Sequence, residues 1–484
     1  MPTRSKLLLP LLLAALFAVV PASPAGASHG QTVYFEASTA LLNPSTRAKA
    51  FEQMRHLGVH ALRVELYWGR VAPAANSAKR PAFNATDPSS YDWSLYDPIL
   101  TEAQRLGWPV LLTVTSPVPR WATSNLKAPY VTRPDSQDFR EFMTAVARHY
   151  GTLVNTYAIW SEPNHPAFLE PQFNSNGSPA SPRIYRGLYQ AGYQGLQEAG
   201  LAHPRVLFGE TAPTGYDSVK SLFRIESKSR ALNHDVAPLA FLREALCLNS
   251  HYRKVGGCSP LQMTGYAHHA YTLPAGPSYK PPEKDNVTIG VLSRLSNALD
   301  KAARAHAIPA RLPIYLTEFG VQSYPNKQLG VPVSVQAEYD AMAEQIAWNN
   351  GRVVAFSQYL LEDDPVGGLP GASVNGGTVG FQTGLEYANG RPKPLYYGWP
   401  VPLVVSKRHH GYSLWGLVRP AGKATTVTVL VRRKGSSSYR ALRNVRTNAA
   451  GYWTLSSSTP GTLWRVRWTS PEGVRYEGPA IRAH

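Results

Sequence analysis

Between residues 31 and 400 the chain alternates short runs, rich in β-branched and aromatic residues, with longer amphipathic stretches. Eight of the short runs are typical of buried strands, and a stretch with helical periodicity follows each of them except the last. The predicted strands cover residues 32–38, 60–68, 108–115, 152–160, 203–210, 261–271, 311–320 and 352–361. Because parallel strands need crossover connections and eight of them close a ring, the alternation predicts a (β/α)8 TIM barrel.

An open, doubly wound sheet is the alternative arrangement of alternating strands and helices. In that fold a glycine-rich turn follows the first strand and binds a phosphate group. Here no glycine-rich turn follows the first predicted strand. The barrel is therefore the better prediction for this part of the chain.

The pattern of the sequence changes after residue 400, where short β-type runs replace the alternation of strands and helices. Seven short β-type runs, separated by Gly, Pro and Ser turns, occupy residues 401–484, and Pro400 and Pro402 stand at the junction. This pattern predicts a small all-β sandwich after the barrel. We therefore divide the mature chain into a barrel domain, residues 28–400, and an accessory domain, residues 401–484.

The first residues have the pattern of an export signal. Arg4 and Lys6 precede the apolar run LLLPLLLAALFAVV, and the small residues Ala-Gly-Ala at 25–27 suit a cleavage site. We expect residues 1–27 to be a signal peptide and the mature protein to be secreted. No later stretch is long and apolar enough for a transmembrane helix, so we expect none in the mature protein.

The chain has 2 cysteines, Cys247 and Cys258. In an exported protein such a pair is typical of a disulfide that closes a small loop. No histidine stands near them at the spacing of a zinc site, and we expect neither a metal ion nor another cofactor.

The net charge of +18 is unevenly distributed. Residues 401–484 contain 14 Lys and Arg against 2 Asp and Glu, a net charge of +12. A basic domain on an exported protein suggests an anionic partner, such as a cell-wall polymer or an acidic polysaccharide. A basic face that only aids solubility is the alternative, and the export signal argues against nucleic acid.

Two glutamates follow strands of the predicted barrel where its active site would lie. Glu162, in IWSEPNH, follows the fourth strand, and Glu318, in LTEFG, ends the seventh. In barrels of this type the active site lies at the carboxyl ends of the strands. Two carboxyl groups that converge there can cleave a glycosidic bond, one as proton donor and one as nucleophile or base.

The motifs WSEPN and LTEFG together resemble those of the clan A glycoside hydrolases, near families 39 and 5. The resemblance spans about residues 31–400. It implies a retaining enzyme that acts on a polysaccharide or oligosaccharide, with Glu162 as acid/base and Glu318 as nucleophile. It also implies that Arg63 keeps the nucleophile ionised, and that His268, His269 or Tyr271 contacts it. Alternation along the sixth strand does not decide among these three residues.

Other residues near the strand ends are possible substrate contacts. Trp68, Trp121 and Trp160 could stack on sugar rings, although core packing is an equally good interpretation for each of them. Glu210, after the fifth strand, is a third acid that could bind a sugar hydroxyl or pair with an arginine.

One position departs from the pattern of the clan, in which an asparagine usually precedes the acid/base. Here that residue is Ser161, and Asn164 is the nearest amide that could replace it. Hydrogen bonds to the sugar 2-hydroxyl strengthen in the transition state, so the serine could change sugar preference or rate. The alternative to an active glycosidase is therefore a carbohydrate-binding surface protein that has lost most of its activity.

Overall fold

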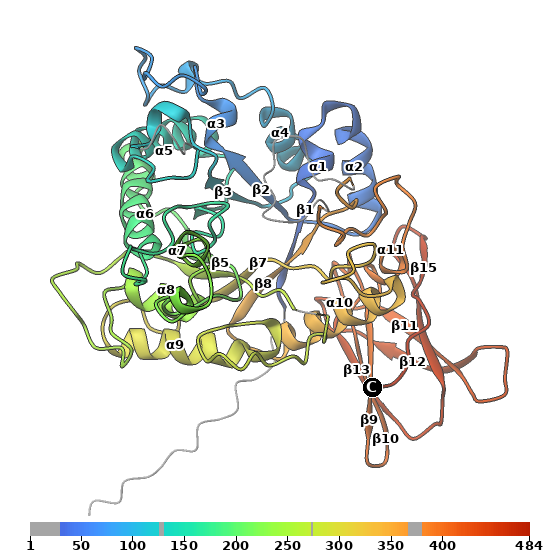
Figure 1. Ribbon diagram of the computed structural model, residues 1–484. Helices are drawn as coiled ribbons and strands as arrows, with labels where there is room; N and C mark the ends of the chain where they lie inside the picture. The colour runs from blue at the N-terminus through green and yellow to red at the C-terminus, as the bar shows by residue number, and fades with distance from the viewer. Residues whose placement is uncertain (1–29, 125–129, 273, 366–379) are drawn as a thin grey trace, which may run out of the picture.

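The computed structural model describes residues 30–124, 130–272, 274–365 and 380–484, and the predicted signal peptide lies outside this range. Its first part is a closed barrel of eight parallel strands that neighbour one another in chain order (Figure 1). They are β1 (Thr32–Glu36), β2 (Leu62–Tyr67), β3 (Val110–Thr115), β4 (Thr156–Ile159), β5 (Val206–Thr211), β6 (Gly265–His269), β7 (Ile314–Glu318) and β8 (Val353–Tyr359). Each overlaps a predicted strand, and the TIM barrel is confirmed.

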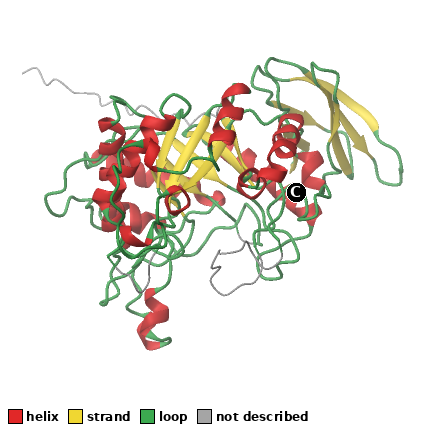
Figure 2. Ribbon diagram, turned by 90° about the horizontal axis from the view of Figure 1, so that it is seen from above, coloured by secondary structure: helices red, strands yellow, loops and turns green. Residues whose placement is uncertain are grey.

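Helices surround the barrel (Figures 1 and 2). They are α1 (Ser38–Leu42), α2 (Pro44–His56), α3 (Trp68–Val71), α4 (Asp97–Arg105), α5 (Ser136–Tyr150), α6 (Ser181–Glu198), α7 (Lys228–Leu232), α8 (Pro238–Ala245), α9 (Leu292–Arg304), α10 (Val333–Trp348) and α11 (Pro394–Gly398). Capping residues and prolines mark the N-termini of several of these helices. Asn43 caps α2, which has Pro44 in its first turn, and Asp135 accepts hydrogen bonds from the backbone of residues 137 and 138 at the start of α5.

The barrel strands bury both of their faces, which is why most of them are largely apolar along their length in the sequence. Along β2 the residues Leu62, Val64 and Leu66 belong to the large core between the barrel and the helices. A second cluster, made mostly of small or aliphatic residues, joins the strands to one another: Tyr34, Ala61, Leu111, Ala158, Leu207, Ala267 and Ala355. On β2, Arg63 and Glu65 alternate with the residues of the large core, so their side chains turn to the inside of the ring.

The C-terminal part consists of two antiparallel sheets beside α10 and α11 (Figure 1). One contains β9 (Leu403–Arg408), β10 (Gly411–Gly416) and β13 (Trp453–Ser457); the other contains β11 (Thr426–Arg432), β12 (Arg440–Arg446), β14 (Leu463–Thr469) and β15 (Arg475–Glu477). Residues of both sheets share one core, to which Val405, Leu414, Val429 and Trp464 belong. The predicted all-β region is confirmed.

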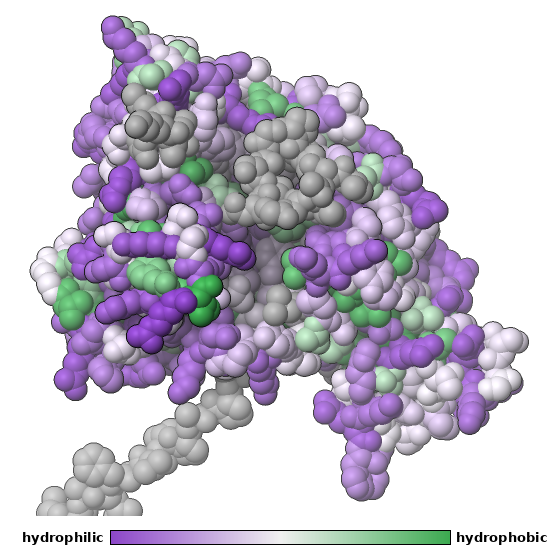
Figure 3. Space-filling model, in the orientation of Figure 1, coloured by the Kyte–Doolittle hydropathy of each residue, from purple (hydrophilic) through white to green (hydrophobic). Residues whose placement is uncertain are grey.

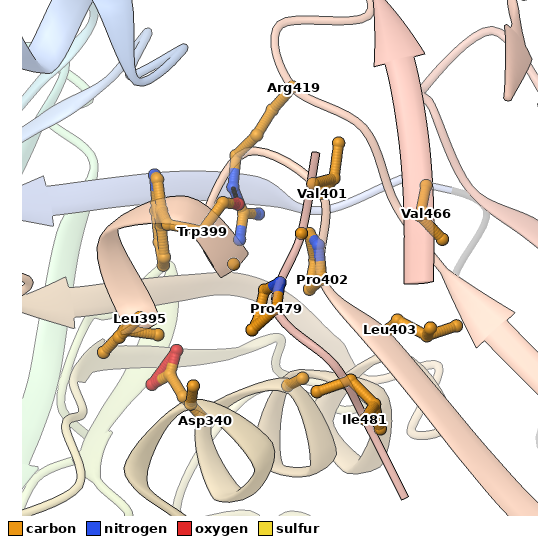
Figure 4. A pocket seen from close by; sticks show the side chains of 14 residues that line it. Asp340, Leu395, Trp399, Val401, Pro402, Leu403, Arg419, Val466, Pro479 and Ile481 are labelled. Atoms are coloured by element: carbon orange, nitrogen blue, oxygen red, sulfur yellow. Dashed lines mark hydrogen bonds between the residues drawn. The ribbon is translucent and has the colours of Figure 1, made fainter. Parts of the chain in front are cut away.

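Arg419 connects the two parts of the molecule (Figure 4). Its guanidinium donates two hydrogen bonds to Glu344 of α10, at 2.6 and 2.9 Å, and one to the carbonyl of Trp399 at 2.7 Å. It also lies 3.7 Å from the centre of the Trp399 ring, and all three residues are buried. Gly58, at φ +80°, approaches the Arg419 backbone so closely that a Cβ atom would collide with it. The contact is therefore packed like a domain core.

The predicted disulfide is also confirmed, because Cys247 and Cys258 are joined. None of the helices within the described residues is long and apolar enough to cross a membrane.

Candidate active site

Arg63 stands at the centre of a cluster of carboxylates inside the barrel, and its side chain has no exposed surface. All five N–H groups of its guanidinium have carboxylate partners. Nε and Nη2 donate to the two oxygens of Glu210 at 3.4 and 2.9 Å, Nη2 also to Glu65 at 3.3 Å, and Nη1 to Glu318 at 3.2 Å and to Glu36. The arginine thus joins residues of β1, β2, β5 and β7.

Glu162 and Glu318 meet beside this cluster. An oxygen of each carboxyl group lies within 4.8 Å of an oxygen of the other. At the end of β4, Trp160 and Glu162 have φ angles of 70° and 39°, in the left-handed region that non-glycine residues rarely adopt. Such conformations cost about 1–3 kcal/mol each and gather at functional sites. With these conformations the Trp160 indole is buried, whereas the Glu162 carboxylate, two residues later, lies at the site.

His269 and Tyr271 contact the two glutamates. The Nδ1 atom of His269 lies 2.9 Å from Glu162 Oε1 and 3.6 Å from Glu318 Oε2. Burial is the main cause that lowers the pKa of His269 to about 3, and the Arg63 charge lowers it further, so the imidazole is neutral at ordinary pH. The Tyr271 hydroxyl donates a 2.5 Å hydrogen bond to Glu318 Oε1.

The two carboxyl groups differ in what favours their ionised form. Burial raises the pKa of both Glu162 and Glu318. Glu318, however, accepts hydrogen bonds from the guanidinium of Arg63 and the hydroxyl of Tyr271, and both stabilise a carboxylate. The hydrogen-bond partner of Glu162 is the neutral imidazole of His269. The pKa of Glu318 is raised well above its ordinary value, and the charges of His165 and Arg63 lower that of Glu162, so the contrast between the two rests on their hydrogen-bond partners: those of Glu318 favour a carboxylate, and that of Glu162 does not.

The interpretation of the tryptophans as sugar contacts is wrong for Trp68 and Trp160. Both are completely buried. Trp68 stacks on Phe142 at 5.2 Å, and Trp160 packs against Phe139 while its Nε1 donates to the carbonyl of Phe168. Both rings therefore fill the layer between the barrel and its helices.

Trp121 belongs to the same aromatic layer. Its ring is T-shaped against Trp68 at 6.0 Å, and its Nε1 donates to the carbonyl of Pro73 at 3.0 Å. Since only 8% of the residue is exposed, it too is a core residue and not a stacking platform.

Asn164 and His268 also have structural roles, which corrects their assignment as substrate contacts. The Asn164 amide donates to the carbonyls of Ala212 and Val236, its oxygen accepts from the Ala212 N–H, and the residue has no exposed surface through which to contact a sugar. The His268 ring is buried between the Thr211 hydroxyl, 3.0 Å away, and the Val287 carbonyl, 2.8 Å away.

Ser161 does occupy the position between the end of β4 and Glu162. Its backbone N–H donates to the Thr115 hydroxyl at 3.1 Å. The residue is buried, and its own Oγ has no hydrogen-bond partner among the described residues. A buried hydroxyl without a partner is costly unless a ligand or water satisfies it.

The sequence interpretation missed Glu36, Glu65 and Tyr67. Glu36 ends β1 and accepts from Ser38 at 2.7 Å, and Tyr67 donates to Glu65 at 2.6 Å. Burial raises the pKa of Glu36 to about 7 even though the Arg63 charge lowers it. Period-two alternation from Arg63 would have placed Glu65 and Tyr67 on the inner face of the same strand.

Figure 3 shows the surface hollowed near the middle of the ring. Among the described residues, Glu162, His269 and Glu318 form the one group whose ligand atoms come close enough together to hold a metal ion. The absence of a metal or cofactor stays a prediction.

Comparison with known proteins finds similarity at the level of three-dimensional structure. No protein-family model matches the chain, and no curated protein sequence does. A family 39 glycoside hydrolase from Bacteroides cellulosilyticus WH2 superposes with a TM-score of 0.50 and 15% identity, over 88% of this chain and 80% of that one. A glucosidase from Croceicoccus marinus gives 0.52 and 10%, over 91% and 95%.

This chain has the fold of those hydrolases. The resemblance to clan A glycoside hydrolases is confirmed at that level. At 10–15% identity the likeness does not extend to activity or substrate.

Proposed function

We propose that the protein is a secreted retaining O-glycosidase that hydrolyses a polysaccharide or oligosaccharide by double displacement. The observation that carries this proposal is the pair of carboxyl groups at the end of the barrel, in which one oxygen of each group lies within 4.8 Å of one oxygen of the other. In retaining glycosidases the two carboxyl groups are about 5–5.5 Å apart, whereas inverting enzymes leave room for a water molecule, at about 6.5–9.5 Å. The observed spacing favours retention.

Each glutamate then has one role. Glu162, which shares its hydrogen bond with a neutral imidazole, protonates the departing oxygen as the glycosidic bond breaks. Glu318, oriented by Arg63 and Tyr271, attacks the anomeric carbon and forms a glycosyl ester. Glu162, now a carboxylate, removes a proton from the water that hydrolyses this ester, and both groups return to their first state.

The roles are tested by replacing each glutamate with glutamine. Glu318→Gln should abolish cleavage of aryl glycosides. Glu162→Gln should slow the hydrolysis of glycosides with poor leaving groups far more than that of glycosides with activated ones, because an activated phenolate leaves without a proton. Glu52→Gln, an exposed change on α2, is the matched control. Full activity of Glu318→Gln, or an inverted product anomer by NMR, would disprove the assignment.

A carbohydrate-binding protein with weak activity is the second candidate, and Ser161 favours it. The amide that clan A enzymes place before the acid/base is absent, and the Asn164 amide is buried and bonded to the backbone elsewhere. If the wild-type protein binds wall polysaccharide but cleaves no member of a broad panel of aryl glycosides, this candidate replaces the glycosidase.

We also propose that the C-terminal domain holds the exported enzyme on an anionic cell-wall polymer. On β14 the residues Trp464, Val466 and Trp468 are buried in the core, while Arg465 and Arg467 alternate with them and point outward. A single carboxylate, Glu477, forms ion pairs with these two arginines and with Arg475, at N–O distances of 2.9–3.5 Å. Arginines therefore outnumber carboxylates on this outer face.

Point substitutions are the appropriate test, because deleting residues 401–484 would strip a buried interface from the barrel. Replacing Arg432, Arg465 and Arg467 by serine should weaken adsorption to polyphosphate or polygalacturonate beads at low salt and flatten its salt dependence. The control variant removes three exposed cations from the barrel instead: Arg55, Lys254 and Arg304. Equal loss in both variants would show that only net charge matters.

A further inference from the structure

The candidate active site contains more acidic groups than the proposed reaction uses. Two carboxyl groups suffice for double displacement. Glu36, Glu65 and Glu210 surround the same guanidinium in addition to Glu318. Additional buried carboxylates destabilise the folded protein. We therefore consider which ligands such a site would bind.

The one cation of the cluster is not available to a substrate. The Arg63 side chain has no exposed surface, and each of its five N–H groups already has a carboxylate partner. A bound carboxylate could therefore reach the guanidinium only by displacing one of these partners.

The acids, by contrast, are the groups that solvent reaches. The exposed fractions of the side chains are 7% for Glu65, 10% for Glu318 and 14% for Glu162. Besides burial, the carboxyls of Glu36, Glu162 and Glu65 raise the pKa of Glu318, and the Arg63 charge opposes them. The accessible side chains of the site are thus carboxyl groups, which offer acceptor oxygens to a ligand but no free cation.

Nearby polar groups do not reverse this balance. The hydroxyls of Tyr67 and Tyr271 already donate to Glu65 and Glu318. His269 is neutral, and His165, on the side of Glu162, lies 3.8 Å from the carboxylate of Asp235. Of the charged groups with the largest effect on the pKa of Glu318, Glu36, Glu162 and Glu65 are acids, and the saturated Arg63 is the cation.

We infer that the sugar bound beside Glu318 carries no carboxylate, that it is a neutral or amino sugar, and that Glu65 is the residue that enforces this choice. The inference rests on the proposed glycosidase function. A uronic acid would bring a carboxylate among carboxyl groups with no free cation to pair with it, which disfavours its binding. Sugar hydroxyls and ammonium groups are donors, and they match the free acceptor positions of Glu65.

Matched pairs of aryl glycosides test the inference in the wild-type protein. Each pair differs only at C6, as hydroxymethyl or carboxylate, in the gluco, galacto and manno series. For the series that is cleaved, kcat/KM of the neutral member should exceed that of the uronide by at least about 100-fold. Equal rates, or a faster uronide, would overturn the inference while leaving the glycosidase proposal intact.

Binding supplies a second readout that does not depend on turnover. A neutral iminosugar and its 6-carboxylate counterpart, compared by calorimetry, should differ at least about 10-fold in Kd in favour of the neutral compound. Tighter binding of the carboxylate would refute the choice of substrate. If no compound binds and no glycoside is cleaved, both proposals fail together.

Glu65→Gln tests the assigned residue, because it removes the charge and keeps the shape. The ratio of the neutral to the uronide kcat/KM should fall about 10-fold, a change that a purely structural role would not produce. Tyr67→Phe, which removes the hydroxyl bonded to Glu65 but no charge, is the matched control, and its ratio should stay near that of the wild type. An unchanged ratio in Glu65→Gln would remove Glu65 from the proposal.

Discussion

The contact between Arg419 and Glu344 makes a quantitative prediction about how the two parts of the chain depend on each other. In Arg419→Met the Glu344 carboxylate, 1% exposed, loses both of its hydrogen bonds from the guanidinium. Removing one partner of a buried ion pair costs about 3–5 kcal/mol. The substitution also removes the cation from the Trp399 ring, a contact worth about 2 kcal/mol when desolvated.

These contributions overlap, and we expect a loss of about 4 kcal/mol in the free energy of unfolding. That is a large share of the stability of a typical protein, about 5–15 kcal/mol. Urea unfolding followed by tryptophan fluorescence and by circular dichroism measures it. Because the interface is buried, the wild type should lose the fluorescence and circular dichroism signals in one transition. In Arg419→Met the two signals should be lost in separate transitions.

Two further variants make the reasoning refutable. Arg419→Met combined with Glu344→Met leaves no buried charge, so it should recover at least about 2 kcal/mol relative to Arg419→Met alone. Arg443→Met, an exposed change on β12, should stay within about 0.5 kcal/mol of the wild type. A loss below about 1 kcal/mol in Arg419→Met would show that the interface does not couple the domains.

Two other predictions concern single side chains. Burial raises the pKa of Asp340 on α10 from 3.8 to about 7, so between these values the unfolded chain releases a proton that the folded chain keeps. The Asp340 contribution to stability therefore falls as pH rises through this window, and Asp340→Asn should gain up to about 4 kcal/mol relative to the wild type between pH 4 and pH 8, measured by urea midpoints. Ser161→Asn should raise kcat about 10-fold for 2-hydroxy glycosides but not for 2-deoxy glycosides; an equal response of both would show that the amide does not reach the sugar.

The alternation of strands and helices was enough to predict the barrel, because each buried parallel strand is a short apolar run bounded by turns. The seven strands of the C-terminal sheets could be predicted from the sequence in the same way, since turns containing Gly, Pro and Ser separate them. Glu162 and Glu318 were found because each lies at the end of a strand whose position in the ring was already predicted.

The directions of side chains at the strand ends could not be predicted in the same way. A strict period of two would not place both Trp160 in the core and Glu162 at the site, and the left-handed conformations of these residues depend on tertiary packing. At Glu210 the register of β5 against β6 shifts, and its φ is 48°. Such irregularities leave no pattern in a single sequence.

The basic outer face of the C-terminal domain and the acidic floor of the barrel select opposite charges. If both proposals hold, the anionic groups that retain the enzyme are not carried as carboxylates on the sugar that it cleaves.

The saturation of Arg63 links the active site to closure of the ring. Its partners come from β1, β2, β5 and β7, so an intermediate with only the first four strands in place would hold Glu36 and Glu65 but neither Glu210 nor Glu318. The guanidinium would then lack the three hydrogen bonds that Glu210 and Glu318 accept, and half a barrel would not form the site. Catalytic competence should therefore emerge late and all at once during folding, when the last strands join the first.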